Sequence, residues 1–104
     1  MIITKLLRAA EWAQFQAAGE FAGSADDIRD GYIHLSPPDQ VAGTAAQWFA
    51  GAAGLMAVTF DADALGDDLR WEPARGGVLF PHLYRPLRLA EVLGATPFAP
   101  PLPA

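Results

Sequence analysis

The chain has no cysteine among its 104 residues, which excludes disulfide bonds and metal sites built from thiolates. It also has no apolar run of the about 20 residues that a membrane-spanning helix needs. The charged start and apolar segment of a secretory signal peptide are missing, so we expect a cytoplasmic protein outside the membrane. Basic residues are few, with seven Lys and Arg against twelve Asp and Glu. Because they are scattered, duplex nucleic acid is not an expected partner, whereas a small molecule or another protein is.

Hydrophobic residues make up 52% of the chain, enough for a folded core, and the length fits one domain. We expect this domain over residues 1–98, followed by a loose proline-rich tail over 99–104. Hydrophobic periodicity predicts helices over 8–18 and 40–50, with one helical turn over 25–29 between them. Strands are predicted over 2–7, 55–60, 69–72, 78–84 and within 87–98. This order predicts an α+β fold, with two N-terminal helices packed on a mostly antiparallel sheet.

Only two histidines occur, and each lies in a segment that is typical of a short strand: Tyr32-Ile33-His34-Leu35-Ser36 and Phe80-Pro81-His82-Leu83-Tyr84. Side chains alternate between the two faces of a strand, so the leucines and the isoleucine are expected in the core. Leu79, just before the second segment, is expected there too. Each histidine then lies on a second face, beside hydroxyl-bearing or aromatic neighbours. Ligand clefts are usually lined in this way, by apolar walls with a few placed polar groups. We therefore predict that His34, Ser36, Glu72, His82 and Tyr84 converge on one concave surface.

Glu72 has two open interpretations. It lies on a predicted strand with Arg70 on the same face, which fits an exposed ion pair of little energetic value. It also fits a carboxylate beside an aromatic cleft, where burial and neighbours tune its acidity. His34, His82 and Glu72 contain the donor types of a catalytic zinc site, but no ligand spacing supports one, so no metal is predicted. Four aromatic side chains have spacings typical of core residues: Trp12, Phe15, Trp48 and Trp71.

Three blocks of the sequence together resemble a small bacterial family, domain of unknown function family 952. They are Asp30-Gly31-Tyr32-Ile33-His34-Leu35-Ser36, Leu69-Arg70-Trp71-Glu72-Pro73 and Leu79-Phe80-Pro81-His82-Leu83-Tyr84. The blocks occur in the family's order with typical spacings, and the resemblance covers nearly the whole chain up to the tail. The family itself implies no activity.

A more distant similarity, to the ADP-ribosyltransferase fold, implies a curved, split sheet that cradles NAD as the substrate. His34-Leu35-Ser36 resembles the His-x-Ser/Thr of its histidine–tyrosine–glutamate class, and Glu72 takes the place of the late glutamate. No tyrosine lies between Ser36 and Glu72, so Trp48, Trp71 or Tyr84 would have to stack on nicotinamide. The resemblance implies that His34 orients ribose hydroxyls and that Ser36 supports the histidine. The glutamate would stabilise an oxocarbenium-like state.

The resemblance thus makes His34 and Glu72 the catalytic candidates. The ligand-binding candidates are Tyr32, Ser36, Arg70, Trp71, Arg75, His82 and Tyr84, and either Arg70 or Arg75 would meet a pyrophosphate. Three functions remain open at this point. The domain is an NAD-processing transferase, a non-catalytic module that binds a nucleotide or other small metabolite, or a protein-interaction domain with an aromatic interface.

Overall fold

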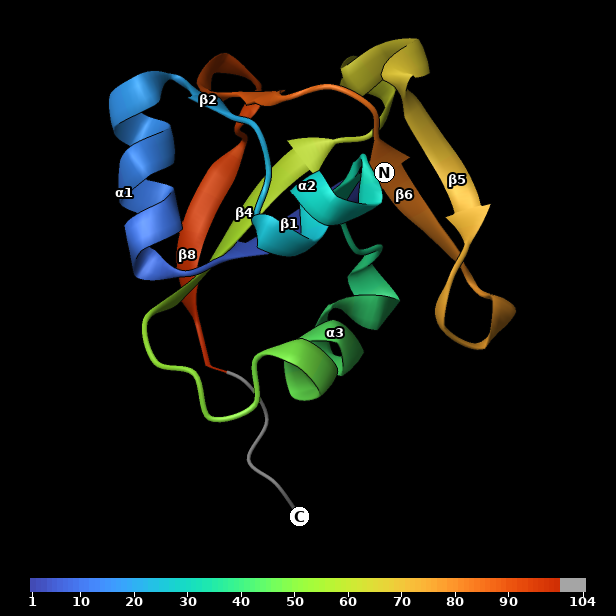
Figure 1. Ribbon diagram of the computed structural model, residues 1–104, viewed down its shortest axis with the longest axis horizontal. Coiled ribbons are helices and arrows are strands. Elements are labelled where there is room, and N and C mark those ends of the chain that lie inside the picture. Colours follow the sequence, from blue (N-terminus) through green and yellow to red (C-terminus); the bar gives the residue numbers. More distant parts are fainter. Residues whose placement is uncertain (100–104) are drawn as a thin grey trace.

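A computed structural model describes residues 1–99, so the predicted tail over 99–104 lies outside this range apart from its first residue. Within the described residues there are three α-helices: α1 (Ala9–Ala18), α2 (Ala25–Asp30) and α3 (Val41–Trp48). The strands are β1 (Ile2–Leu7), β2 (Glu20–Phe21), β3 (Ile33–His34), β4 (Leu55–Asp61), β5 (Leu69–Pro73), β6 (Leu79–Leu83), β7 (Leu87–Arg88) and β8 (Gly94–Phe98). These elements form one small α+β domain (Figure 1).

The central sheet has the order β1-β4-β8, and β4 pairs antiparallel with both neighbours. β4 is apolar on both faces except for Thr59 and its last residue, Asp61, as a central strand should be. α1 stands alongside this sheet in Figure 1, and its Phe15 is fully buried in a core that includes Ile3, Val58 and Phe60. α1 ends at Gly19, whose positive φ of 78° lets its N–H bond the Phe15 carbonyl at 2.8 Å.

Both histidines lie in a second sheet, of order β3-β6-β5, where His34 and His82 are direct cross-strand partners. Just beyond β3, Ser36 exchanges two backbone hydrogen bonds with Thr4 of β1, at 2.9 and 2.8 Å. This bridge joins the edge of the central sheet to the second sheet. It explains why side chains from β1, β3 and β6 face a common space.

Three predicted core residues are instead exposed. Trp48 is 61% exposed, Trp71 39% and Leu79 51%, whereas Phe15 is buried and Trp12 packs against the core. Trp48 lies at the last turn of α3, a helix that buries only Ala45 completely. Trp71 and Leu79 belong to the β5–β6 hairpin, which projects from the body of the domain (Figure 1). Periodicity identifies which residues share a face, but it does not show whether another layer covers that face.

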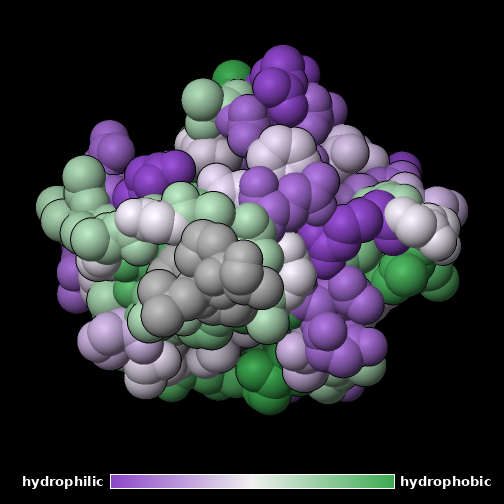
Figure 2. Space-filling model, turned by 90° about the horizontal axis from the view of Figure 1, so that it is seen from below, coloured by the Kyte–Doolittle hydropathy of each residue, from purple (hydrophilic) through white to green (hydrophobic). Residues whose placement is uncertain are grey.

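The surface seen in Figure 2 is mixed, with hydrophobic atoms on the hairpin side and hydrophilic groups between them and the rest of the domain. Among residues 1–99, no helix is both long and apolar enough to cross a membrane.

Candidate functional site

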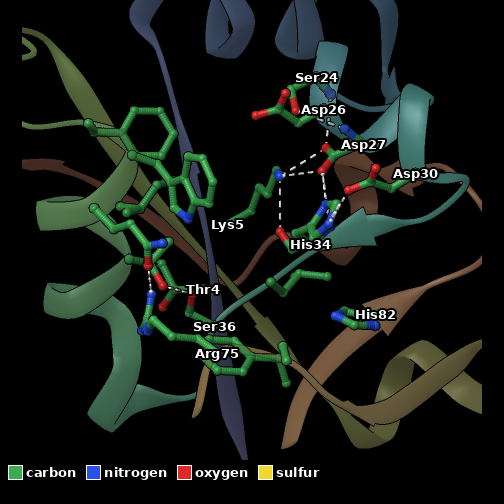
Figure 3. Close-up of a pocket in the computed structure, with 18 of the residues that line it drawn as sticks. Thr4, Lys5, Ser24, Asp26, Asp27, Asp30, His34, Ser36, Arg75 and His82 are labelled. Atoms are coloured by element: carbon green, nitrogen blue, oxygen red, sulfur yellow. Dashed lines mark hydrogen bonds and ion pairs between the residues drawn. The ribbon is translucent and has the colours of Figure 1, made fainter. Parts of the chain in front are cut away.

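A cavity of about 350 Å³, here called the main cavity, opens between α2, α3 and the strands β1, β3 and β6. Figure 3 shows its polar side chains, which approach from opposite sides. Carboxylates of α2 lie at one end, an arginine from the loop after β5 lies near α3, and His34 and His82 come from neighbouring strands. Its apolar lining includes Trp48, Phe49 and Phe80.

Asp27 is the buried centre of the acidic end, with only 3% of its surface exposed. Its Oδ1 accepts hydrogen bonds from the Lys5 ammonium at 3.1 Å, the His34 backbone N–H at 3.1 Å and His34 Nδ1 at 2.7 Å. Its Oδ2 accepts the Ser24 backbone N–H at 2.9 Å, which caps α2, and lies 2.9 Å from Lys5 Nζ. Burial by itself raises the pKa of Asp27. The bond from His34 and the charge of Lys5 outweigh burial and hold that pKa well below its ordinary value.

The His34 ring is held on both of its nitrogens. Nδ1 meets Asp27, and Nε2 lies 3.0 Å from Oδ2 of Asp30, a carboxylate at the rim whose side chain is 32% exposed (Figure 3). Arg29 also pairs with Asp30, and its hydrogen bond is the main reason why the pKa of Asp30 is lowered. The resemblance implied that Ser36 supports the histidine, but the Ser36 hydroxyl does not contact the His34 ring. It lies 2.9 Å from the hydroxyl of Thr44 instead.

Arg75 supplies a positive charge near α3, at a distance from the carboxylates of the acidic end. Its guanidinium donates to the amide oxygens of Gln47 at 3.0 Å and Gln40 at 2.9 Å, and it lies 5.1 Å above the Phe80 ring. Among residues 1–99 no carboxylate comes within ion-pair distance of this guanidinium. Gly43 leaves room for it, because a Cβ there would lie 3.0 Å from Arg75 Nη2.

His82 is nearly buried, with 4% exposure, and belongs to a second histidine–carboxylate pair. Its Nδ1 lies 2.8 Å from Oε1 of Glu72, and the Tyr84 hydroxyl donates to the same oxygen at 2.6 Å. These two hydrogen bonds, Tyr84 first, lower the pKa of Glu72. Burial lowers the pKa of His82, although the bond to Glu72 opposes this shift. The Tyr32 ring stacks on His82, with centroids 4.1 Å apart.

The predicted site residues therefore separate into three groups. Four of them line the main cavity: His34, Ser36, Arg75 and His82. Tyr32 and Tyr84 border a smaller neighbouring cavity of about 220 Å³, while Glu72, Arg70 and Trp71 line neither cavity. Glu72 reaches the main cavity only through His82, and the Arg70 guanidinium lies 4.9 Å above the Tyr84 ring.

Sequence reasoning missed the residues that hold the acidic end together. The Asp27 carboxylate forms part of the cap of α2 and also binds Lys5 and His34. A usable signal was present. Lys5 is the only lysine of the chain and lies inside a strand that is apolar apart from Thr4, and a lysine is almost never buried without a partner.

Groups of three or more His, Cys, Asp or Glu with metal-binding geometry do not occur in the part of the chain that the structure describes. The carboxylates beside the two histidines, Asp27 and Glu72, form hydrogen bonds with the histidine rings instead.

Comparison with known proteins places the chain in a family. It is similar to protein CC0527 from Caulobacter crescentus, whose crystal structure shares 49% sequence identity at a TM-score of 0.91, covering 93% of this chain and 85% of that chain. The solution NMR structure of CC0527 gives 50% identity and a TM-score of 0.83, covering 92% and 83%. No curated protein matches the chain significantly. The family described as protein of unknown function (DUF952) matches residues 6–95, and this chain belongs to it.

Proposed function

We propose that the main cavity binds a small nucleotide-like ligand that carries both an anionic group and hydroxyl groups. The observation that carries this proposal is the unequal charge pairing along the cavity. Each carboxylate at the acidic end already has a cation partner: Asp27 with Lys5, and Asp26 and Asp30 with Arg29. Arg75 has amide oxygens and an aromatic ring as partners instead.

An anionic group of the ligand fits at Arg75. A guanidinium binds phosphate or carboxylate through paired, charge-assisted hydrogen bonds, which are about twice as strong as neutral ones. Gln40 and Gln47 fix the position of the guanidinium without neutralising it, so the charge remains for a ligand. The Phe80 ring below it provides an apolar floor.

Hydroxyl groups of the ligand fit at the rim near His34. Asp30 is the most accessible acceptor that contacts the histidine, and its carboxylate can take a ribose hydroxyl in addition to its protein contacts. Trp48 lines the mouth and is 61% exposed, so its ring is available for stacking with a base. A ribosyl phosphate with an attached base would use all three features.

The geometry favours binding over an ADP-ribosyl transfer driven by Glu72. That role requires a carboxylate facing the reacting carbon, whereas Oε1 of Glu72 accepts hydrogen bonds from His82 and Tyr84. NAD and ADP-ribose remain the first ligands to test, because the His34-Leu35-Ser36 resemblance indicates a ribosyl group. Nicotinamide release on incubation with NAD would establish the transferase instead.

Isothermal titration calorimetry with ADP-ribose, ribose 5-phosphate and adenosine tests the proposal. We expect the two phosphorylated ligands to bind and adenosine, which lacks an anionic group, to bind more weakly. Arg75→Ala should weaken ADP-ribose binding by about 10- to 100-fold, the value of one charged hydrogen-bond partner. Arg88→Ala is the matched control, since Arg88 is exposed on β7 and does not line the cavity. Equal affinities for the two variants, or no binding to the wild type, would reject the proposal.

Gly43→Ala is expected to separate stability from binding. An alanine inside α3 is favoured over glycine by up to about 1 kcal/mol, so the melting temperature should rise or stay level. The added methyl group would lie 3.0 Å from Arg75 Nη2 and displace the guanidinium, so ADP-ribose affinity should fall. Thermal unfolding and calorimetry on the same sample check both effects. An unchanged affinity would show that the position of Arg75 is unimportant.

Ligand binding should change the fluorescence of Trp48 specifically. The chain has three tryptophans, and of these only Trp48 lines the main cavity. A base that stacks on its ring should quench its emission, and Trp48→Phe should remove the signal. Trp71→Phe is the control, because Trp71 is also partly exposed but lies on the hairpin. A signal that is lost in Trp71→Phe and kept in Trp48→Phe would place the ligand elsewhere.

A further inference from the structure

We infer that His82, rather than His34, is the proton-accepting imidazole of the main cavity, and that it takes a proton from a hydroxyl group of the bound ligand. The choice of a hydroxyl-bearing ligand rests on the proposed function, whereas the state of the His82 ring does not. The inference reverses the sequence-based expectation, which made His34 the catalytic histidine.

The His34 ring has no free nitrogen to accept a proton from a ligand. Its Nδ1 lies 2.7 Å from Asp27 and its Nε2 lies 3.0 Å from Asp30, so each ring nitrogen already faces a carboxylate of the protein. Asp27 in turn is fixed by Lys5 and by the cap of α2. His34 is therefore a positioning residue that holds Asp30 at the rim of the cavity.

His82 has the opposite arrangement. Its Nδ1 donates to Glu72 at 2.8 Å, and a neutral imidazole with a proton on Nδ1 carries a lone pair on Nε2. No protein group in residues 1–99 forms a hydrogen bond with Nε2. Every buried side-chain nitrogen or oxygen of these residues has a hydrogen-bond partner, so the unpaired Nε2 is accessible and not buried. His82 lines the main cavity (Figure 3), and we take this cavity as the space to which Nε2 opens.

The surroundings of His82 keep the ring neutral and hold it in place. The Tyr32 ring stacks on the His82 ring with centroids 4.1 Å apart, and the His34 ring lies edge-on to the His82 ring with centroids 5.5 Å apart. Glu72 of β5 favours the charged form, as does Asp30 of α2, whereas burial and a charge on His34 oppose it. Burial is the largest of these effects and lowers the pKa of His82. A neutral ring near pH 7 is the form that can accept a proton.

The proton transfer involves one bond broken and one bond formed. The ligand O–H bond breaks, its proton forms an N–H bond at Nε2, and the electron pair stays on the oxygen, which takes the negative charge. Glu72 stabilises the resulting imidazolium through Nδ1, and the Tyr84 hydroxyl holds Glu72 in position. Phe80, over whose ring the Arg75 guanidinium lies, precedes His82 by two residues on β6, a rise of roughly 7 Å along the strand.

Nitrogen NMR of the histidine rings in the full chain tests the inference without any ligand. The chain has only two histidines, so in the His34→Gln variant the only histidine ring signals are those of His82. At pH 7 we expect His82 to be neutral, protonated on Nδ1 and bare on Nε2, and to titrate below the usual range for histidine. Glu72→Gln should keep this tautomer through its amide oxygen but shift the titration midpoint further down, because the negative charge is lost.

The bare Nε2 signal should also move when ADP-ribose is added. A cationic His82 ring at pH 7, or a proton on Nε2 with a bare Nδ1, would overturn the assignment. The expected tautomer without a response to ADP-ribose would support the role of His82 and would reject the proposed ligand class instead. The two failures are therefore distinguishable.

Discussion

Asp27→Ala is expected to lower the free energy of unfolding by about 3–5 kcal/mol, the usual cost of removing one partner from a buried ion pair. The variant leaves the Lys5 ammonium, which is 7% exposed, without its counter-charge. It also leaves the backbone N–H groups of Ser24 and His34 without their acceptor, so the Asp27 half of the capping box of α2 is lost. For a domain of this size, whose total stability is about 5–15 kcal/mol, such a loss is a large fraction.

Urea unfolding followed by circular dichroism measures this loss, with Asp26→Ala as the matched control. Asp26 lies in the same turn of α2, but its side chain is 60% exposed, and within residues 1–99 its only ion pair is with an exposed Arg29. Surface pairs of this kind contribute about 0–1 kcal/mol. Similar losses in the two variants would show that the Asp27 network does not stabilise the fold.

The sequence patterns that predicted the fold correctly were local ones. The helix predicted over 8–18 is α1, which ends before Gly19, and the strand predicted over 55–60 is β4, an apolar strand at the centre of its sheet. These features depend on backbone conformation and on burial within a single element. The exposure of Trp48 and Trp71 could not be found in this way, because it depends on which elements cover α3 and the hairpin.

For the candidate site, strand alternation predicted that His34 and His82 face one surface, and in the structure their ring centroids lie 5.5 Å apart. The same alternation could not assign their partners. Glu72 binds His82 and Tyr84 because β5 pairs with β6, a long-range register that no local pattern fixes. Asp27 meets Lys5 across 22 residues of sequence, through the approach of α2 to β1. The chemistry of each histidine therefore follows from contacts that only the fold creates.

Lys5→Met is expected to destabilise the domain at neutral pH by about 3 kcal/mol, since the apolar stem remains but Asp27 loses its cation. The pH dependence of this loss identifies its cause. In the wild type the pKa of Asp27 lies well below that of the unfolded chain, near 3.9, so its stabilisation is present above about pH 4. It is lost as the pH falls further, because the unfolded chain then binds the proton more readily than the folded chain does.

Without Lys5, burial raises the pKa of Asp27 against less opposition, so the folded carboxyl takes up a proton more easily. The stability gap between the wild type and Lys5→Met should therefore narrow by about 1 kcal/mol between pH 5 and pH 3. Urea unfolding at pH 7, 5 and 3 measures the gap, and Arg88→Met provides an exposed cation as the control. A gap that stays constant with pH would show that Lys5 stabilises the domain through its packing alone. A narrowing gap would show that its charge acts on Asp27.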